Sequence, residues 1–267
     1  MSSSLIRRIA ARVELPLDSG DENVIRLACN LAVRAGASVQ ALAYETNVLS
    51  PQSSLADDSF PAAKVQLEAW GKELGAPITV HGRTNYADGV GETFGTLLQL
   101  CDIGILGVPA QQTPAFRMIA NAAIFNGGPV IFLPPSTAPN VSFSRIVVAW
   151  KPGGASSRAL KAAIALADSD TQVVIVQVEE TSTSNIDEVG IEATHFAAAH
   201  GVRAEFRVVP ARGHSAFSAL DAAADEIGAN LLVSGAVHHG PFHQSLFGSV
   251  TKDLMDAGFQ RPTLLAG

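Results

Sequence analysis

Apolar residues along the chain form two kinds of pattern: short continuous runs, and groups with helical spacing. In the second half, the runs RIVVAW (145–150) and QVVIVQV (172–178) have the length and composition of buried parallel strands. Between them, from Leu160 to Ala167, apolar residues recur three and four positions apart, which predicts an amphipathic helix. The second half is therefore expected to begin with a strand, a helix and a second strand.

The alternation of strands and helices continues along the whole chain. In the second half, further strands are predicted at 202–209, 231–235 and 262–266, and helices at 185–200 and 217–227. In the first half, strands are predicted at 9–15, 38–44, 78–81, 102–108 and 129–133, and helices near 24–31, 61–74, 94–101 and 115–125. Strands that alternate with helices predict parallel sheets with right-handed crossovers and helices on both faces.

The two halves of the chain repeat each other in the order of their elements and partly in sequence. Three correspondences are Arg8-Ile9 with Arg145-Ile146, Gly107 with Gly235, and Pro129-Val130 with Pro262-Thr263. Such an internal repeat predicts the duplication of a βαβ-type domain. The segment PPSTAPN between the halves has three prolines and no periodicity, as in a linker. We therefore predict two domains, at 1–138 and 139–267.

Composition and charge narrow the class of protein. With 47% hydrophobic and 16% charged residues, the chain is expected to fold and not to be disordered. The net charge of -7 and the lack of a basic run argue against nucleic acid as a partner. No apolar run approaches the roughly 20 residues that cross a bilayer, and the N-terminus does not resemble a signal peptide. Cys29 and Cys101 lie in apolar helical patterns, which predicts buried, reduced thiols in a cytoplasmic protein.

The stretch 231–252, LLVSGAVHHGPFHQSLFGSVTK, carries the clearest candidate site. A short apolar run ends at Gly235, a loop rich in glycine and histidine follows, and a helical pattern begins near Ser249. Free backbone N–H groups and the helix dipole make such a helix start suitable for an anion. In a doubly wound sheet, ligands bind beyond the carboxyl ends of strands at the topological switch point. There the loops 151–154 and 235–240 are expected to face each other.

These segments resemble the universal stress protein family, and the whole chain resembles its tandem, two-domain members. The resemblance rests on RIVVAW, on QVVIVQV, and on GAN-LLVSG-AVHH followed by LFGSVTKDLM; in the first half it rests on DIGILGV and AIFNGGPVIFLPP. It implies an α/β fold of two tandem doubly wound domains, each with a five-stranded parallel sheet in the order 3-2-1-4-5 flanked by helices. Members of one branch bind ATP through G-x2-G-x9-G-[ST] after the fourth strand, with an acidic residue after the first.

Several positions of the second half match this motif. Gly235 corresponds to its first glycine, and Gly248 and Ser249 correspond to its final pair with the right spacing. Val250 follows as in the family and is expected to offer a backbone N–H to a phosphate. Val178, at the end of the second strand, corresponds to a residue that lines the adenine pocket. The resemblance therefore implies a nucleotide site in the second domain, whereas for Gly248-Ser249 an ordinary capped helix start stays open as an alternative.

Two positions depart from the motif. His238 stands at the second glycine, so the loop would have to approach a phosphate through Gly240 instead. Lys151 replaces the acidic residue after the first strand, and an ammonium group cannot accept a hydrogen bond from an adenine amino group. Trp150 beside it is expected to pack in the core or to form a wall of the pocket, and not to stack on a base. In the first half the final pair is Ala120-Asn121, so that domain is expected to be structural.

We therefore expect a sensor or binding module whose second domain binds ATP or another adenine nucleotide, or a similar phosphate-bearing ligand. The sequence has no nucleophile elbow, Walker lysine loop or HExxH motif, so no catalytic residue is predicted. Three histidines, at 238, 239 and 243, lack a nearby acidic or cysteine ligand and do not predict a metal site. Gly153-Gly154 could cradle an anion, although an ordinary turn is favoured. The alternative is a degenerate member that binds no nucleotide and acts through homodimerisation and protein contacts, with the apolar final strands at the dimer seam.

Overall fold

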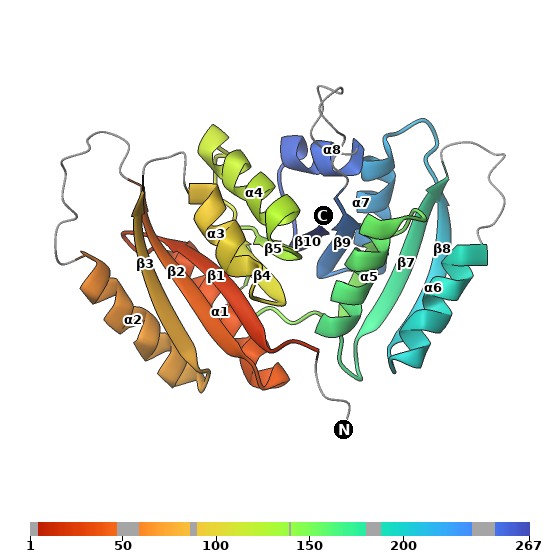
Figure 1. Cartoon of the computed structure of the whole chain (residues 1–267). Coiled ribbons are helices and arrows are strands. Elements are labelled where there is room, and N and C mark those ends of the chain that lie inside the picture. The colour runs from red at the N-terminus through yellow and green to blue at the C-terminus, as the bar shows by residue number, and fades with distance from the viewer. Residues whose placement is uncertain (1–4, 47–58, 86–89, 139, 180–187, 237–248) are drawn as a thin grey trace. The chain divides into compact units, whose positions relative to one another are not determined.

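The computed structural model describes residues 5–46, 59–85, 90–138, 140–179, 188–236 and 249–267 (Figure 1). The chain divides into two compact units, Met1–Val141 and Ser142–Gly267. Each unit contains a parallel sheet of five strands with helices on both of its faces. The predicted α/β fold with two tandem doubly wound sheets is confirmed.

Unit 1 contains nine described elements. They are β1 (Arg8–Glu14), α1 (Ser19–Ala35), β2 (Ser38–Thr46), α2 (Ser59–Leu74), β3 (Ile78–Asn85), α3 (Val90–Leu98), β4 (Ile103–Gly107), α4 (Pro114–Asn126) and β5 (Val130–Leu133). The strand order is β3-β2-β1-β4-β5, which is the predicted 3-2-1-4-5. α1 packs on β1, β2 and β4, and α2 packs on β2 and β3. α3 packs on β1 and against α4.

Helix α1 is bounded by local signals in the sequence. The Asp18 side chain accepts a hydrogen bond from Asp21 N–H (2.9 Å), and the Asp21 carboxylate accepts from Asp18 N–H (3.2 Å), so the two residues form a capping box. At the other end, Gly36 adopts a left-handed conformation with φ 63° and closes the helix. A glycine in this conformation is a common end of a helix.

Unit 2 repeats the arrangement. Its elements are β6 (Arg145–Ala149), α5 (Gly154–Leu166), β7 (Gln172–Glu179), α6 (Glu188–Ala199), β8 (Arg203–Pro210), α7 (Ala216–Ile227), β9 (Leu231–Gly235), α8 (Ser249–Ala257) and β10 (Thr263–Ala266). The strand order is β8-β7-β6-β9-β10, again 3-2-1-4-5. α5 packs on β6, β9 and β10, and α6 on β7 and β8. α7 packs on β6, β7 and β8 and also contacts α8.

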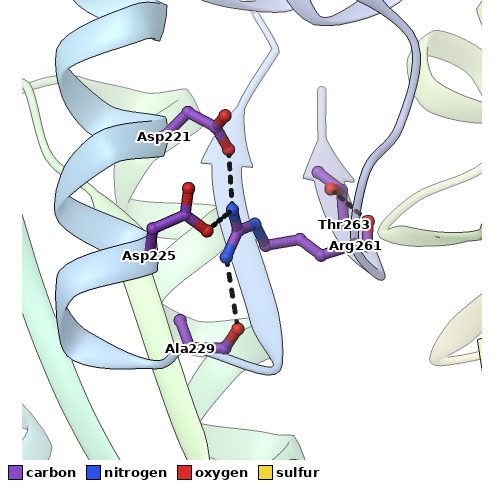
Figure 2. A network of polar contacts seen from close by, with 5 residues as sticks. All are labelled: Asp221, Asp225, Ala229, Arg261 and Thr263. Atoms are coloured by element: carbon purple, nitrogen blue, oxygen red, sulfur yellow. Dashed lines mark hydrogen bonds and ion pairs between the residues drawn. The ribbon is translucent and has the colours of Figure 1, made fainter.

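An ionic network joins the segment before β10 to α7 (Figure 2). One Nη atom of Arg261 donates to Asp221 Oδ1 (3.0 Å) and to Asp225 Oδ1 (2.5 Å). Its other Nη atom donates to the backbone oxygen of Ala229 (3.4 Å), at the start of the turn into β9. One guanidinium therefore links the last strand to α7 and to the turn before β9.

The two cysteines differ from each other in burial. Cys29 is fully buried in α1, as predicted, and burial raises its thiol pKa to about 11. Cys101 is only half-buried, so that prediction is wrong. The apolar spacing continues past the end of α3 at Leu98, and Cys101 lies in the following turn, where its N–H donates to Leu98 O (2.9 Å). None of the described helices is long and apolar enough to cross a membrane.

Candidate functional site

The candidate site lies at the carboxyl ends of β6 and β9 in unit 2. These strands are neighbours, with Ile146 beside Leu231 and Val148 beside Val233. From β6 the chain enters α5, which packs on one face of the sheet; from β9 it leads to α8, which packs with α7. Parallel strands whose connections leave for opposite faces open a crevice at the edge of the sheet. The predicted switch point therefore lies where the structure places residues 150–154 and 235.

Gly235 ends β9 directly beneath the first turn of α5. A Cβ atom on this residue would lie 2.6 Å from the carbonyl carbon of Ala155 and 2.7 Å from the backbone nitrogen of Ser156. Both neighbours are backbone atoms, so any side chain here would displace the helix. The packing of α5 on β9 thus requires a glycine at this position whether or not a ligand binds.

Val178 and Val250 lie on the opposite face of the sheet from α5. Both are half-buried and pack against an apolar cluster formed by strands β6, β7 and β9 together with α7. The cluster includes Val176 and Leu220, which are almost completely buried. Both predicted site residues therefore border the same apolar cluster on the α7 face of the sheet.

Trp150 follows β6 and lies on the α5 face. Its N–H donates to Val176 O (2.8 Å), which continues the pairing with β7 by one residue. Because side chains alternate along a strand, Trp150 and Gly235 share the face opposite Val178. The Trp150 side chain is 8% exposed, and its indole Nε1 is buried without a hydrogen-bond partner among the residues that the structure describes. Lys151, the next residue, is exposed.

Helix α5 begins without a side-chain cap. Its N-cap is Gly153, with φ 160° and ψ 165°, and its first turn contains no acidic residue. Ser157 donates both its N–H and its hydroxyl to Gly153 O (3.0 Å each), and Gly153 itself has no side chain that could cap the helix. The residues from Lys151 to Gly154 are all exposed. The start of α5 consequently presents backbone N–H groups toward solvent.

Of the remaining predicted site residues, the structure describes Ser249 but not the others. His238, Gly240 and Gly248 lie outside the residues that the structure describes. Ser249 is the first residue of α8, as the helical pattern indicates. For these positions the match to the glycine motif stays a prediction.

At the equivalent edge of unit 1, sequence reasoning missed a group of charged residues. Arg12 in β1 is 7% exposed, lies 3.5 Å from a carboxylate oxygen of Glu14, and stacks over the ring of Tyr44 at 5.3 Å. Asp21 accepts hydrogen bonds from Glu14 N–H (3.1 Å) and from the N-cap of α1. Burial raises the pKa of Asp21 to about 6, although those hydrogen bonds act in the opposite direction. The signal available in the sequence was an arginine inside an otherwise apolar strand.

Comparisons with known proteins give a consistent result for the fold. No family model matches the chain, and no curated protein matches its sequence. A universal stress protein structure from Archaeoglobus fulgidus DSM 4304 aligns with 96% of this chain and 95% of its own, with a TM-score of 0.73 and 15% identity. A structure from Pseudomonas aeruginosa UCBPP-PA14, also described as a universal stress protein, aligns with 100% of this chain and 95% of its own, with a TM-score of 0.67 and 17% identity.

A further structure covers only one of the two units. It is a universal stress protein in complex with cAMP, which aligns with 48% of this chain and 99% of its own at 23% identity, with a TM-score of 0.39. The two full-length alignments cover 96% and 100% of this chain, and so include both units. The chain therefore has the tandem two-domain fold of the universal stress proteins.

Proposed function

We propose that the protein is a universal stress protein-like sensor or binding module whose unit 2 binds an adenine nucleotide or a similar phosphate-bearing ligand. The observation that supports this most is the exposed, basic and uncapped start of α5 at the switch point between β6 and β9. Switch points are where doubly wound sheets bind ligands. Backbone N–H groups at a helix start and a nearby ammonium group favour an anion.

The charge of the edge favours phosphate over other polar groups. Lys151 and Arg158 both lie near the first turn of α5, and the segment between them has no acidic residue. Lys151 directly follows Trp150, which continues the pairing of β6 with β7. Its side chain therefore starts at the edge of the sheet, and its ammonium group can reach a ligand there. Since Lys151 cannot accept a hydrogen bond from an adenine amino group, we assign it to the phosphate part of the ligand.

The apolar part of a nucleotide would lie on the other face. Val178 and Val250 are half-buried at the carboxyl end of the α7 cluster, and their methyl groups can contact a planar base. Such contacts are less selective than hydrogen bonds to the base edge, so they do not favour adenine over another planar base. We therefore expect the phosphate to contribute more to affinity than the base, and we expect binding without turnover.

Calorimetry tests this proposal. Titration of the full chain with ATP, ADP, AMP and cAMP should give saturable heat, and adenosine should bind more weakly because it lacks phosphate. A Lys151→Glu variant should lose affinity, whereas Lys161→Glu, the same charge change on an exposed residue further along α5, should not. An absence of heat with every nucleotide at millimolar concentration would overturn the proposal. Light scattering would then be needed to examine homodimerisation, on which the alternative depends.

A further inference from the structure

We propose that β8 is a surface for self-association, at which two copies of the chain pair edge to edge through antiparallel β8 strands. Such pairing requires no ligand, so it is independent of the proposed function. The contact lies at β8 and not at the apolar final strands that the sequence suggested. Three features of unit 2 support it: the position of β8 at an edge of the sheet, the backbone groups that this strand turns outward, and the order of charges along it.

β8 forms one edge of the sheet of unit 2 (Figure 1). Among the described strands its only neighbour is β7, in a continuous parallel register from Gln172 beside Arg203 to Glu179 beside Pro210. In a parallel pair, the N–H and C=O of one residue point to the same side, and successive residues alternate between the two sides. Ala211 N–H donates to Glu179 O (2.9 Å), so the odd-numbered residues of β8 face β7.

The even-numbered residues of β8 therefore turn their backbone groups away from the described sheet. They include Ala204, Phe206 and Val208, each with one N–H and one C=O. Pro210, the next residue of this set, has no N–H and ends the row of donors. An edge strand with such a row of groups is a template for another strand. An antiparallel copy of β8 offers the same three donors and three acceptors in the opposite order.

The charges of β8 select one register for such a pair. With the two-fold axis at Phe206, all three outward residues find partners, and Glu205 lies opposite Arg207 of the partner subunit on both sides of the axis. Opposite charges at directly paired positions stabilise a sheet, and like charges destabilise it. An axis at Glu205 or at Arg207 would place like charges opposite each other. An axis nearer either end of the strand would leave one outward residue unpaired.

The charged side chains lie on the α7 face of the sheet. Val209 packs against the apolar cluster on that face, and side chains alternate along a strand, so Glu205 and Arg207 lie there too. They are 41% and 44% exposed, and Arg207 Nη2 lies 2.6 Å from Glu205 Oε1. In the pair, two glutamates and two arginines would alternate in one group. Because this group stays in contact with water, it selects the register more than it adds affinity.

The other face of β8 carries apolar surface. Phe206 lies against Gly190 of α6, so Phe206 and Val208 share the α6 face. Val208 is 40% exposed, and in the register above it lies opposite Ala204 of the partner subunit. In the described part of unit 2, all exposed large hydrophobic side chains belong to α6 and β8; they are Val189, Ile191, Phe196 and Val208. A partner copy at this edge would remove part of this surface from water.

Charge reversal tests the register. Glu205→Arg places an arginine opposite Arg207 of the partner subunit, and Arg207→Glu places a glutamate opposite Glu205 of the partner subunit. Each variant should therefore dimerise about tenfold more weakly than the parent, or worse. An equimolar mixture of the two variants restores opposite charges at both positions and should form a heterodimer. Arg203→Glu is the matched control, because Arg203 lies opposite Val209 of the partner subunit, and it should dimerise as the parent does.

A proline substitution tests the backbone pairing. Val208→Pro removes an N–H that points away from β7, so the sheet of unit 2 keeps its hydrogen bonds while the pair loses one from each strand. Val208→Thr keeps this N–H and a side chain of similar shape. Dimerisation should be lost in the proline variant and kept in the threonine variant. Urea unfolding followed by Trp150 fluorescence shows whether each variant is folded.

Sedimentation equilibrium of the full chain without nucleotide, from about 1 μM to about 0.1 mM protein, measures the dissociation constant of the dimer. A parent that stays monomeric over this range would overturn the inference. Dimers that persist in folded Glu205→Arg and Val208→Pro would also overturn it, because the contact would then lie elsewhere. Association in the mixture of Glu205→Arg with Arg207→Glu, and in neither variant alone, would support it, since misfolded variants could not restore each other.

Discussion

Gly235→Ala is the substitution whose effect follows most directly from the geometry. The added methyl group would lie 2.6 Å and 2.7 Å from backbone atoms of Ala155 and Ser156, which are held in the first turn of α5. Neither atom belongs to a flexible side chain, so the helix itself has to move. Overpacking of this kind costs about 1–3 kcal/mol. We expect a loss of about 2 kcal/mol in the free energy of unfolding of unit 2.

Gly107 in unit 1 provides the matched control. It ends β4 as Gly235 ends β9, but a Cβ atom there would meet only Cγ2 of Val24, at 3.2 Å. A methyl group at the end of a valine side chain can yield by a few tenths of an ångström. Because alanine also restricts the unfolded chain more than glycine does, Gly107→Ala should change stability by less than about 1 kcal/mol.

The measurement uses one tryptophan in each unit. Trp70 lies in α2 and Trp150 follows β6, so a Trp70→Phe background makes fluorescence report on unit 2, and Trp150→Phe makes it report on unit 1. With a urea m-value of about 1–3 kcal/mol/M, a loss of about 2 kcal/mol shifts the midpoint of unit 2 by roughly 1 M. Equal midpoint shifts for Gly235→Ala and Gly107→Ala would refute the close-approach explanation. If the explanation holds, lost ligand binding in Gly235→Ala is not evidence of a phosphate contact.

Three further predictions concern charged groups away from α5. The folded-state pKa of Asp21 is raised to about 6 from 3.8, so the folded state binds a proton here more tightly than the unfolded chain does. The resulting stabilisation of the fold is complete below about pH 4 and is lost as pH rises to above 6. Stability relative to Asp21→Asn should therefore fall by about 1–3 kcal/mol between pH 4 and pH 7.5 in urea titrations. Glu14→Gln should destabilise unit 1 by less than about 1 kcal/mol, because Glu14 is 53% exposed and Asp21 still compensates the buried Arg12 charge; a loss above about 2 kcal/mol in urea unfolding would contradict this. Arg261→Met should destabilise unit 2 by about 1–3 kcal/mol, and Asp225→Asn by less than about 1 kcal/mol because Asp225 is 70% exposed, as urea unfolding followed by Trp150 fluorescence can show.

The arrangement of elements was predictable because the strands of a doubly wound sheet are covered on both faces. Such strands are continuous apolar runs, and RIVVAW and QVVIVQV are recognisable without any structure. Helix ends were predictable where a glycine stops the helix, as at Gly36. They were not predictable where apolar spacing persists into a turn, which is why Cys101 was assigned to a helix. Periodicity records which residues are apolar but not where the backbone hydrogen bonds stop.

The sequence predicted at which edge of the sheet the candidate site lies, but not on which face of the sheet each of its side chains lies. Order along the chain brings residues 150–154 and 235 to one edge, since parallel strands share the direction of their carboxyl ends. Which face each side chain occupies depends on the register of β6 with β7 and β9. That register separates Val178 from Trp150 and Gly235. In unit 1 the register of β1 with β2 likewise pairs Glu14 with Tyr44, a contact between segments that no local pattern indicates.

Because the two units are repeats, the charged residues at the start of α5 can be compared directly with those at the start of α1. Counted from the equivalent Arg8 and Arg145, Glu14 and Lys151 occupy the same position; Glu14 is the last residue of β1, and Lys151 lies just after β6. Unit 1 combines its glutamate with a carboxylate cap on α1, so its helix start is neutralised by its own residues. Unit 2 combines a lysine with the glycine cap Gly153, so both changes favour an external anion. Both differences make the start of α5 more positive than the start of α1, which is why the proposed anion is expected at unit 2 and not at unit 1.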